Sequence, residues 1–80
     1  MAAPTHTVDV RGLPCPIPLV RLAAAVLGLQ PGARVRLLGT DAALRTDLPA
    51  WCAATGHRLL SLADVGAMLE AWVEVAPVQR

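Results

Sequence analysis

The stretch MLEAWVEV, residues 68–75, decides the predicted fold because it alternates apolar and polar side chains, as a half-buried β-strand does. One side of this strand carries only apolar residues, namely Leu69, Ala71, Val73 and Val75. The other side carries Glu70, Trp72 and Glu74. Because glutamate side chains are almost never buried without a partner, this second side is not covered by a helix. We therefore expect a sheet with one covered face and one open face.

Three shorter stretches upstream, residues 7–10, 34–37 and 58–62, also have the pattern of strands. Between them lie two segments with helical patterns, one running from Cys15 to Leu27 and the other from near Pro49 to Gly56. The order β-α-β-α-β-β predicts an α/β two-layer sandwich, with two helices on one face of a four-stranded mixed sheet. The first three strands are expected to be parallel, and the last antiparallel to its hairpin partner.

Glycine and proline mark the boundaries of these elements. Gly28 and Gly56 are natural ends for the two helices. Residues 30–33 have Pro-Gly at their centre and predict a type II turn. Residues 63–67 are expected to form the turn before the last strand.

The second helix is expected to start at a cap supplied by Thr46 or Asp47, just before Pro49. Helical spacing places four residues on its inner face, namely Leu48, Trp51, Cys52 and Thr55. Cys52 is therefore interpreted as a small core residue, and buried thiols are usually inert.

Eighty residues are enough for a single domain, which we expect to span residues 1–80 with its core at about 7–75. Hydrophobic residues make up 55% of the chain, but fifteen of them are alanine, and phenylalanine and tyrosine are absent. The core is therefore expected to consist mainly of leucine and valine, with Trp51 and Trp72 as the only large aromatic side chains.

Charge and hydropathy exclude several classes of function. All seven basic residues are arginine, spread along a chain of net charge +1, so no basic patch for direct nucleic-acid binding is expected. The longest uncharged stretch, between Arg21 and Arg34, is shorter than the ~20 residues that a membrane span needs. Residues 1–7 show no export signal. We expect a cytoplasmic protein in which both cysteines are free thiols.

Cys15 is the strongest candidate for a reactive group. Proline is favoured at the first helical position, so Pro16 predicts that Cys15 is the N-cap, and Pro18 stiffens the first turn. The positive end of the helix dipole can stabilise a thiolate and lower its pKa from near 8.5 toward ~3.5–7.5. Since no second cysteine lies close in sequence to resolve a disulfide, such a thiol is suited to accept a group, hold it and pass it on. A purely structural cysteine remains the alternative at this point.

The segment DVRGLPCPIP, residues 9–18, resembles the signature Asp-x-Arg-Gly-Leu-x-Cys-Pro-x-Pro of the TusA-type (SirA-like) sulfur carriers. A second block supports the resemblance, consisting of Asp41, residues 47–52 and Gly56-His57. Together the two blocks extend the resemblance over residues 7–75. The family's fold is also a two-layer α/β sandwich.

The resemblance implies a sulfurtransferase that acts as a persulfide relay. Cys15 would be the catalytic residue, with Arg11, Gly12, Pro16 and Pro18 in supporting positions. Sulfane sulfur would come from a cysteine desulfurase or a rhodanese-like donor and pass to an acceptor protein, often for tRNA thiolation, molybdenum-cofactor synthesis or sulfur oxidation. Neither a metal nor an organic cofactor is implied, and we expect a monomer.

The remaining polar residues have competing interpretations. Arg11 either holds Cys15 as an anion or orients the loop, and Gly12 answers a backbone requirement. Asp9 and Asp47 are interpreted as loop and cap residues, and His57 as a surface or hydrogen-bonding residue. Trp72 is either a partner contact on the open face or is covered by Arg36.

Two other classes of function stay open at the level of sequence. One is a regulatory or protein-binding module that uses the open sheet face. The other is a thiol redox sensor or metal chaperone, although the spacing of Cys15, Cys52 and histidine offers no support for a metal site.

Overall fold

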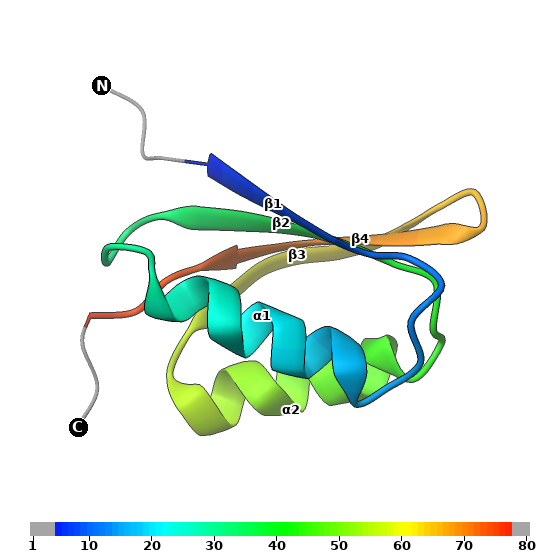
Figure 1. Ribbon diagram of the computed structural model, residues 1–80, viewed down its shortest axis with the longest axis horizontal. Coiled ribbons are helices and arrows are strands. Elements are labelled where there is room, and N and C mark those ends of the chain that lie inside the picture. Colours follow the sequence, from blue (N-terminus) through cyan, green and yellow to red (C-terminus); the bar gives the residue numbers. More distant parts are fainter. Residues whose placement is uncertain (1–4, 78–80) are drawn as a thin grey trace.

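Strand β4 (Met68–Glu74) alternates between half-buried and buried side chains along its whole length, as its sequence predicts. It belongs to a four-stranded sheet in a computed structural model that describes residues 5–77 (Figure 1). The other strands are β1 (Thr5–Val10), β2 (Arg34–Gly39) and β3 (Arg58–Val65), and the helices are α1 (Ile17–Leu27) and α2 (Leu44–Thr55). The predicted order β-α-β-α-β-β is confirmed.

The strands lie in the order β1-β2-β4-β3. β1 pairs with β2 in parallel, while β4 is antiparallel to both β2 and β3. The first three strands therefore run in one direction and β4 runs in the other, as expected. Because β4 lies between β2 and β3, the sheet contains one parallel pair and two antiparallel pairs.

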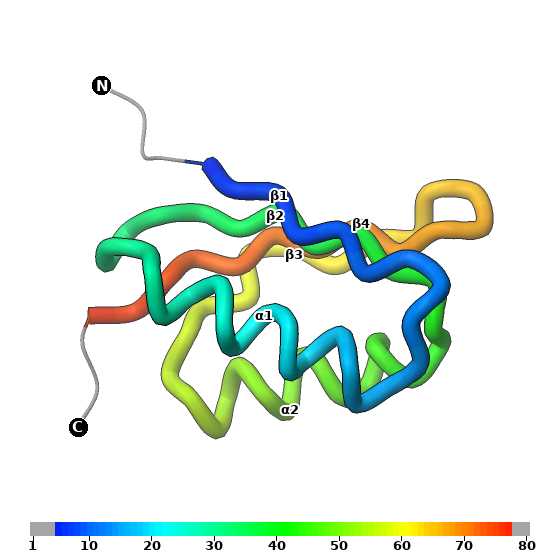
Figure 2. The backbone as a smooth tube through the Cα atoms, viewed as in Figure 1, coloured from blue at the N-terminus to red at the C-terminus, as the bar shows by residue number. Residues whose placement is uncertain are grey.

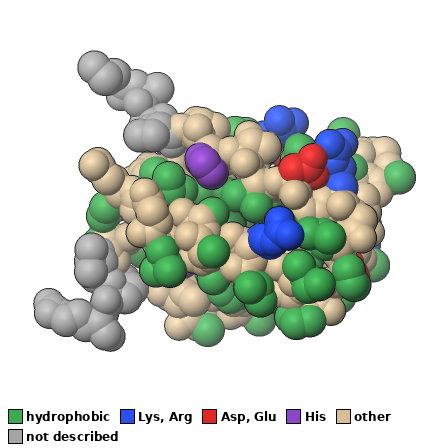
Figure 3. All heavy atoms as spheres, viewed as in Figure 1, with side chains coloured by type: hydrophobic (Ala, Val, Ile, Leu, Met, Phe, Trp, Pro, Cys, Tyr) green, Lys and Arg blue, Asp and Glu red, His purple; other side chains and the backbone are tan. Residues whose placement is uncertain are grey.

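Both helices cover the same face of the sheet, which confirms the two-layer sandwich (Figure 1). The core between the layers consists of aliphatic side chains and Cys52. Its largest fully buried side chains are Leu22, Leu37, Leu44, Leu48, Val10, Val35, Val73 and Pro18. The surface also carries hydrophobic side chains, which gather at the lower right of Figure 3, where Figure 1 shows the start of α1.

The predicted start of α2 is wrong by about one turn. The helix begins at Leu44, and neither Thr46 nor Asp47 caps it. A side chain outside the helix, Asp41, performs a similar task, because its Oδ1 accepts a hydrogen bond of 2.9 Å from the backbone N–H of Ala43. Pro49, which suggested a later start, lies inside the helix, where it cannot donate a backbone hydrogen bond to the carbonyl of Arg45.

The hairpin between β3 and β4 is tighter than predicted. β3 continues to Val65, which pairs with Met68, so the turn consists of Gly66 and Ala67 alone rather than residues 63–67. Gly66 has φ of +64°, and a glycine with positive φ at the first turn position is typical of a two-residue hairpin loop.

The predicted breakers are confirmed. α1 ends at Gly28, and α2 ends at Gly56, which has φ of +88° and donates its N–H to the carbonyl oxygen of Cys52. Gly32 also has φ of +88°, and the N–H of Ala33 donates to the carbonyl oxygen of Gln30, as a type II turn requires. In residues 5–77, neither helix has the length and hydropathy to cross a membrane.

Candidate functional site

Cys15 lies at the end of the molecule where the loops after β1 and β2 meet, and Figure 2 shows these two loops side by side. Two hydrogen bonds tie the loops together. The N–H of Gly12 donates to Oγ1 of Thr40, and the N–H of Cys15 donates to Oδ2 of Asp41, each at 2.8 Å. The parallel pairing of β1 and β2 explains the meeting, because the carboxyl ends of parallel strands lie at the same edge of a sheet.

Cys15 is not the N-cap of α1, which corrects the sequence prediction by one residue. Pro16 occupies the cap position, and the helix proper begins at Ile17. The peptide bond between Cys15 and Pro16 is cis. The N–H of Ile17 donates to the carbonyl oxygen of Pro14, and that of Leu19 donates to the carbonyl oxygen of Pro16, so both of these N–H groups at the start of the helix already have acceptors.

The predicted lowering of the thiol pKa is also wrong. Partial burial raises the pKa of Cys15 above its ordinary value, and the negative charges of Asp41 and Asp47 raise it further. A hydrogen bond between the thiol and the Asp47 carboxylate adds to the same effect, because it stabilises the protonated form. The resting Cys15 is therefore a thiol, whereas the Asp41 carboxyl, which accepts backbone hydrogen bonds from Cys15 and Ala43, has a lowered pKa.

Arg11 orients the loop rather than the sulfur. Its Nε and Nη2 donate to the two carboxylate oxygens of Asp9 at 2.9 and 2.7 Å, and its backbone N–H donates to the same side chain at 3.1 Å. These bonds lower the pKa of Asp9 to about 2. Of the two interpretations of Arg11, the structure supports the one in which it holds the loop in shape.

The other supporting residues meet backbone and packing requirements. Gly12 has φ of +80°, which confirms that its role is conformational. Pro18 is fully buried in the core at the second helical position, while Pro16 is exposed beside Cys15. The thiol is thus carried by a short segment that is anchored on one side by Gly12 and on the other by Pro18.

The second cysteine is confirmed as a core residue. Cys52 is 4% exposed, and burial raises the pKa of its thiol. Nearby, His57 is confirmed as a hydrogen-bonding residue, because its Nδ1 accepts a bond of 3.0 Å from the N–H of Ala76. Its ring stacks on Trp51 with the ring centroids 5.2 Å apart.

Trp72 lies half-buried on the open face, directly opposite Arg36 in the register of β2 and β4. Arg36 directs its Nε to the carboxylate of Glu70 at 2.5 Å. Whether Trp72 is a partner contact is not tested by this arrangement, and that expectation stays a prediction.

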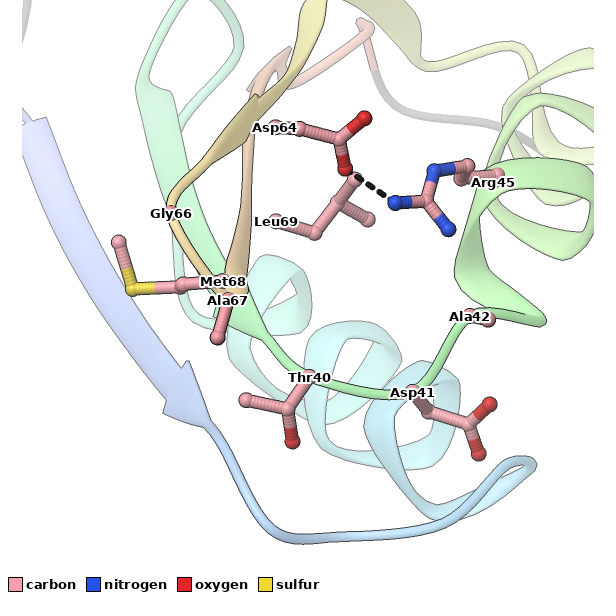
Figure 4. Close-up of a pocket in the computed structure, with 9 residues that line it drawn as sticks. All are labelled: Thr40, Asp41, Ala42, Arg45, Asp64, Gly66, Ala67, Met68 and Leu69. Atoms are coloured by element: carbon pink, nitrogen blue, oxygen red, sulfur yellow. Dashed lines mark hydrogen bonds and ion pairs between the residues drawn. The ribbon is translucent and has the colours of Figure 1, made fainter.

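Two pockets lie at the same end of the molecule as Cys15, but Cys15 lines neither of them. The first, of about 220 Å³, lies between α2 and the hairpin of β3 and β4. Figure 4 shows Arg45 and Asp64 pointing toward one another across it, and they form an ion pair. Cys15 itself is half-buried and packs against the edge of the core.

Asp41 is the site residue whose role sequence reasoning missed. It appeared only as part of a resemblance, yet it accepts hydrogen bonds from both Cys15 and Ala43. The sequence did contain a clue, because Asp41 follows the second predicted strand by a few residues. The chain leaves that strand at the same edge of the sheet as the loop that carries Cys15.

A protein-family model described as "Sulfurtransferase TusA" matches residues 6–75, which include the whole Cys15 site and every element of the fold except Thr5, the first residue of β1. The chain belongs to the TusA family. This membership supports a role in sulfur transfer. The earlier resemblance, drawn from residues 9–18 and the second block, is confirmed.

The names of curated relatives agree with this assignment. A Bacillus subtilis protein named "Putative sulfur carrier protein YrkI" is 38% identical over 66 residues, which is 82% of this chain and 88% of the relative. Two Neisseria meningitidis proteins, one from serogroup A and one from serogroup B, also carry the name "Putative sulfur carrier protein". Each is 38% identical over 60 residues, covering 75% of this chain and 81% of the relative.

Proposed function

We propose that this protein is a sulfur carrier that accepts sulfane sulfur on Cys15 as a persulfide and passes it to an acceptor protein. The observation that carries the proposal is the placement of Cys15. It is a half-buried thiol on a loop held by Gly12, Asp41 and Pro18, within a chain of the TusA family. A thiol displayed in this way can meet the reactive cysteine of one partner after another.

Loading begins with the protonated thiol of Cys15 and a persulfide on the donor. The thiol proton passes to the Asp47 carboxylate, whose negative charge helps to raise the pKa of the thiol. The sulfur of Cys15 then bonds to the terminal sulfur of the donor persulfide, and the sulfur–sulfur bond of the donor breaks. The donor leaves as a thiolate and takes up the proton from Asp47. Sulfane sulfur moves without any net oxidation or reduction, so the step needs no further reagent.

The acidic surroundings favour the onward step. A persulfide on Cys15 that ionises carries its negative charge near Asp41 and Asp47, and like charges raise the free energy of the loaded state. An acceptor thiolate attacks the outer sulfur of the protonated persulfide, and the sulfur–sulfur bond of Cys15 breaks. Cys15 leaves as a thiolate and takes up the proton of the new acceptor persulfide, which regenerates the thiol. The site as proposed therefore holds sulfur only weakly, which suits a carrier better than a store.

The donor and the acceptor are part of the proposal. We take a cysteine desulfurase or a rhodanese-like protein as the donor, and an acceptor in tRNA thiolation, molybdenum-cofactor synthesis or sulfur oxidation. The relay is placed in the cytoplasm, where Cys15 and Cys52 stay reduced. A monomer suits the proposal, because the sulfur of Cys15 must meet successive partners.

The burial of Cys52 favours a relay over a redox sensor. A sensor that closes a disulfide between the two cysteines would need the Cys52 sulfur to leave the core, where it is 4% exposed. A binding module on the open sheet face stays as the second candidate, because Trp72 lies half-buried there.

The test is the intact mass of the protein, taken without reductant after incubation with a cysteine desulfurase, its pyridoxal-phosphate cofactor and cysteine. We expect a gain of one sulfur atom in the wild type and in Cys52→Ala, and no gain in Cys15→Ala. Absence of a gain from every desulfurase and rhodanese tried, and also from glutathione persulfide, would refute the relay. A reversible Cys15–Cys52 disulfide formed with peroxide would favour the sensor instead.

A further inference from the structure

The outer face of α1 carries an exposed apolar surface that begins beside Cys15. Ile17 is 41% exposed, Val20 62% and Leu27 88%. Ala24 is also exposed. The spacing of these four residues places them within about a third of the helix circumference, opposite the buried Leu22 and Val26. We call this surface, made of Ile17, Val20, Arg21, Ala24 and Leu27, the α1 stripe.

Such a surface is unusual for a helix that packs on a sheet, because the face turned to solvent is normally charged or polar. Figure 3 shows hydrophobic side chains gathered over the start of this helix. The residues span about 15 Å along the axis, as ten steps of 1.5 Å imply. Large apolar side chains that are exposed together at this density mark a contact surface.

Arg21 is the charged residue of the α1 stripe, and it is exposed. Among residues 5–77, no ion pair or hydrogen bond engages its side chain. Four other arginines pair with carboxylates, namely Arg11, Arg36, Arg45 and Arg58, whereas Arg34 has no ion pair among residues 5–77. An unpaired arginine inside an apolar contact surface is typical of an interface position, because its planar head binds a carboxylate strongly when water is excluded.

We propose that the α1 stripe docks the protein that exchanges sulfur with Cys15, and that this partner presents an apolar surface carrying a carboxylate for Arg21. This inference rests on the proposed function. Ile17 lies two residues after Cys15, so a partner seated on the stripe also reaches the thiol. Docking on the stripe would remove water from the surroundings of Cys15.

A second copy of this chain fits the α1 stripe poorly. Two stripes packed against each other would bring two Arg21 side chains into one apolar contact, and the stripe itself contains no carboxylate to pair with either. Burying two unpaired cations is costly. Charge complementarity therefore favours a different protein with an acidic residue in its docking surface.

The test compares two routes of sulfur loading in Val20→Glu, Arg21→Glu and Arg21→Lys. The protein route uses the cysteine desulfurases and rhodaneses encoded in the same genome, and the small-molecule route uses glutathione persulfide. Persulfide on Cys15 is followed by intact mass against time. Because glutathione persulfide needs only the thiol, its rate should stay within twofold of wild type.

The protein route should slow by roughly tenfold or more in Val20→Glu and Arg21→Glu, as expected when a central interface contact is lost. Arg21→Lys should retain a larger part of the rate than Arg21→Glu, because it keeps the positive charge. The matched control is Ala53→Glu, which introduces the same charge at an exposed position of α2 and should leave both routes unchanged. Circular dichroism establishes that each variant is folded.

The outcomes separate this inference from the proposed function. Loss of both routes in the wild type would refute the sulfur relay itself. If every donor loaded Val20→Glu and Arg21→Glu at the wild-type rate, the docking inference alone would be overturned. The same would follow if glutathione persulfide loaded the wild type but no protein donor did. A wild-type dimer that Val20→Glu converts to a monomer, with unchanged loading, would assign the stripe to a second copy and also overturn it.

Discussion

Cys15 lies near two carboxylates, and these decide how its sulfur behaves at rest. Asp41 binds the backbone N–H of Cys15, and Asp47 hydrogen-bonds to the thiol itself. Together with partial burial they raise the thiol pKa, so the neutral thiol predominates at physiological pH. A thiol held in this state is protected from indiscriminate alkylation and oxidation, because the thiolate is the reactive species. A partner that changes the surroundings of the thiol can then release its reactivity.

Replacing Asp47 with asparagine should make Cys15 more reactive at neutral pH. The substitution removes a negative charge and the acceptor that stabilises the protonated thiol, so the pKa of Cys15 falls and the thiolate fraction at a given pH rises. Alkylation of Cys15 by iodoacetamide, followed by peptide mass, should be severalfold faster than in wild type at pH 7.5. The midpoint of its pH profile should move to lower pH.

The matched control is Glu74→Gln, which removes a carboxylate on the open face of the sheet, away from the loops that hold Cys15. Its alkylation profile should coincide with that of wild type. If Asp47→Asn left the midpoint where it is, or moved it to higher pH, the assignment of Asp47 as a neighbour that raises the pKa would be wrong.

Gly12 should tolerate alanine poorly, for a reason confined to its own backbone. A Cβ added at Gly12 would meet no atom within 4 Å, but φ is +80°, a region that residues other than glycine rarely adopt. We expect Gly12→Ala to lower the free energy of unfolding by about 1–2 kcal/mol, measured by urea titration. Gly28→Ala is the contrasting variant, since Gly28 has an ordinary φ of −93° and should be neutral or stabilising by about 0.4–1 kcal/mol. Equal effects of the two substitutions would contradict this account.

At this scale, sequence reasoning placed Cys15 beside the start of α1 and misjudged the direction of its pKa shift. Cys15, Gly12 and the core position of Cys52 follow from neighbours in the chain, such as the two prolines and the helical spacing around Leu48. The direction of the pKa shift of Cys15 does not follow from its neighbours in the chain, because it depends also on Asp41 and Asp47, which are far away in the sequence. The role of Arg11 was likewise ambiguous until its pairing with Asp9 was visible.

Among the elements, the contact between β2 and α2 brings Asp41 to the site. β2 ends at Gly39, and α2 begins at Leu44, whose side chain is fully buried. A Cβ on Gly39 would overlap Cδ1 of Leu44, so the absence of a side chain lets the start of α2 pack on the end of the strand. The short connection from Thr40 to Ala43 is thereby held in place, with Asp41 facing Cys15.

A double-mutant cycle should reveal this contact. Gly39→Ala should cost about 1–3 kcal/mol in the free energy of unfolding, as overpacking of a filled core does. Leu44→Ala should cost about 2–5 kcal/mol through the cavity that it leaves. In the double variant the new methyl group occupies part of the space vacated by Leu44, so the combined loss should be smaller than the sum by at least about 0.5 kcal/mol.

Urea titrations of the four proteins provide the measurement. If the losses in the free energy of unfolding were additive, Gly39 and Leu44 would act independently. The start of α2 would then not need a residue without a side chain at the end of β2.

Sequence patterns located every element but not the start of α2. Pro49 suggested a start close to it, because proline is favoured in the first turn of a helix. The true start depends on Leu44 docking against Gly39 and on Asp41 reaching Ala43, neither of which has a periodic signature. The length of β3 was underestimated for a related reason, since its last residues are exposed and lack the alternation that marked β4.

In the molecule as a whole, the position of β4 joins the two halves of the sheet. It pairs with β2 on one side and β3 on the other, so the last strand of the chain is central in the sheet. Its inner residues Leu69, Ala71 and Val73 are at most 5% exposed. The two-layer sandwich was predictable from the alternation in residues 68–75. The order of the strands could not be predicted from this alternation, because the covered and open faces of the sheet are the same whether β4 lies at its edge or in its centre.

This order predicts which amides resist hydrogen exchange. β2 and β4 have a strand on both sides, and their inner residues Val35, Leu37 and Val73 are at most 1% exposed, so their amides should exchange only by global unfolding. β1 and β3 are edge strands, and β3 has a register irregularity between Leu59 and Ser61, so both should exchange through local opening and faster than β2 and β4. Native-state exchange followed by NMR at increasing urea provides the measurement. If the amides of β1 were protected as well as those of β4, a fifth strand or a partner would have to cover that edge, and the open-edged sheet described here would be incomplete.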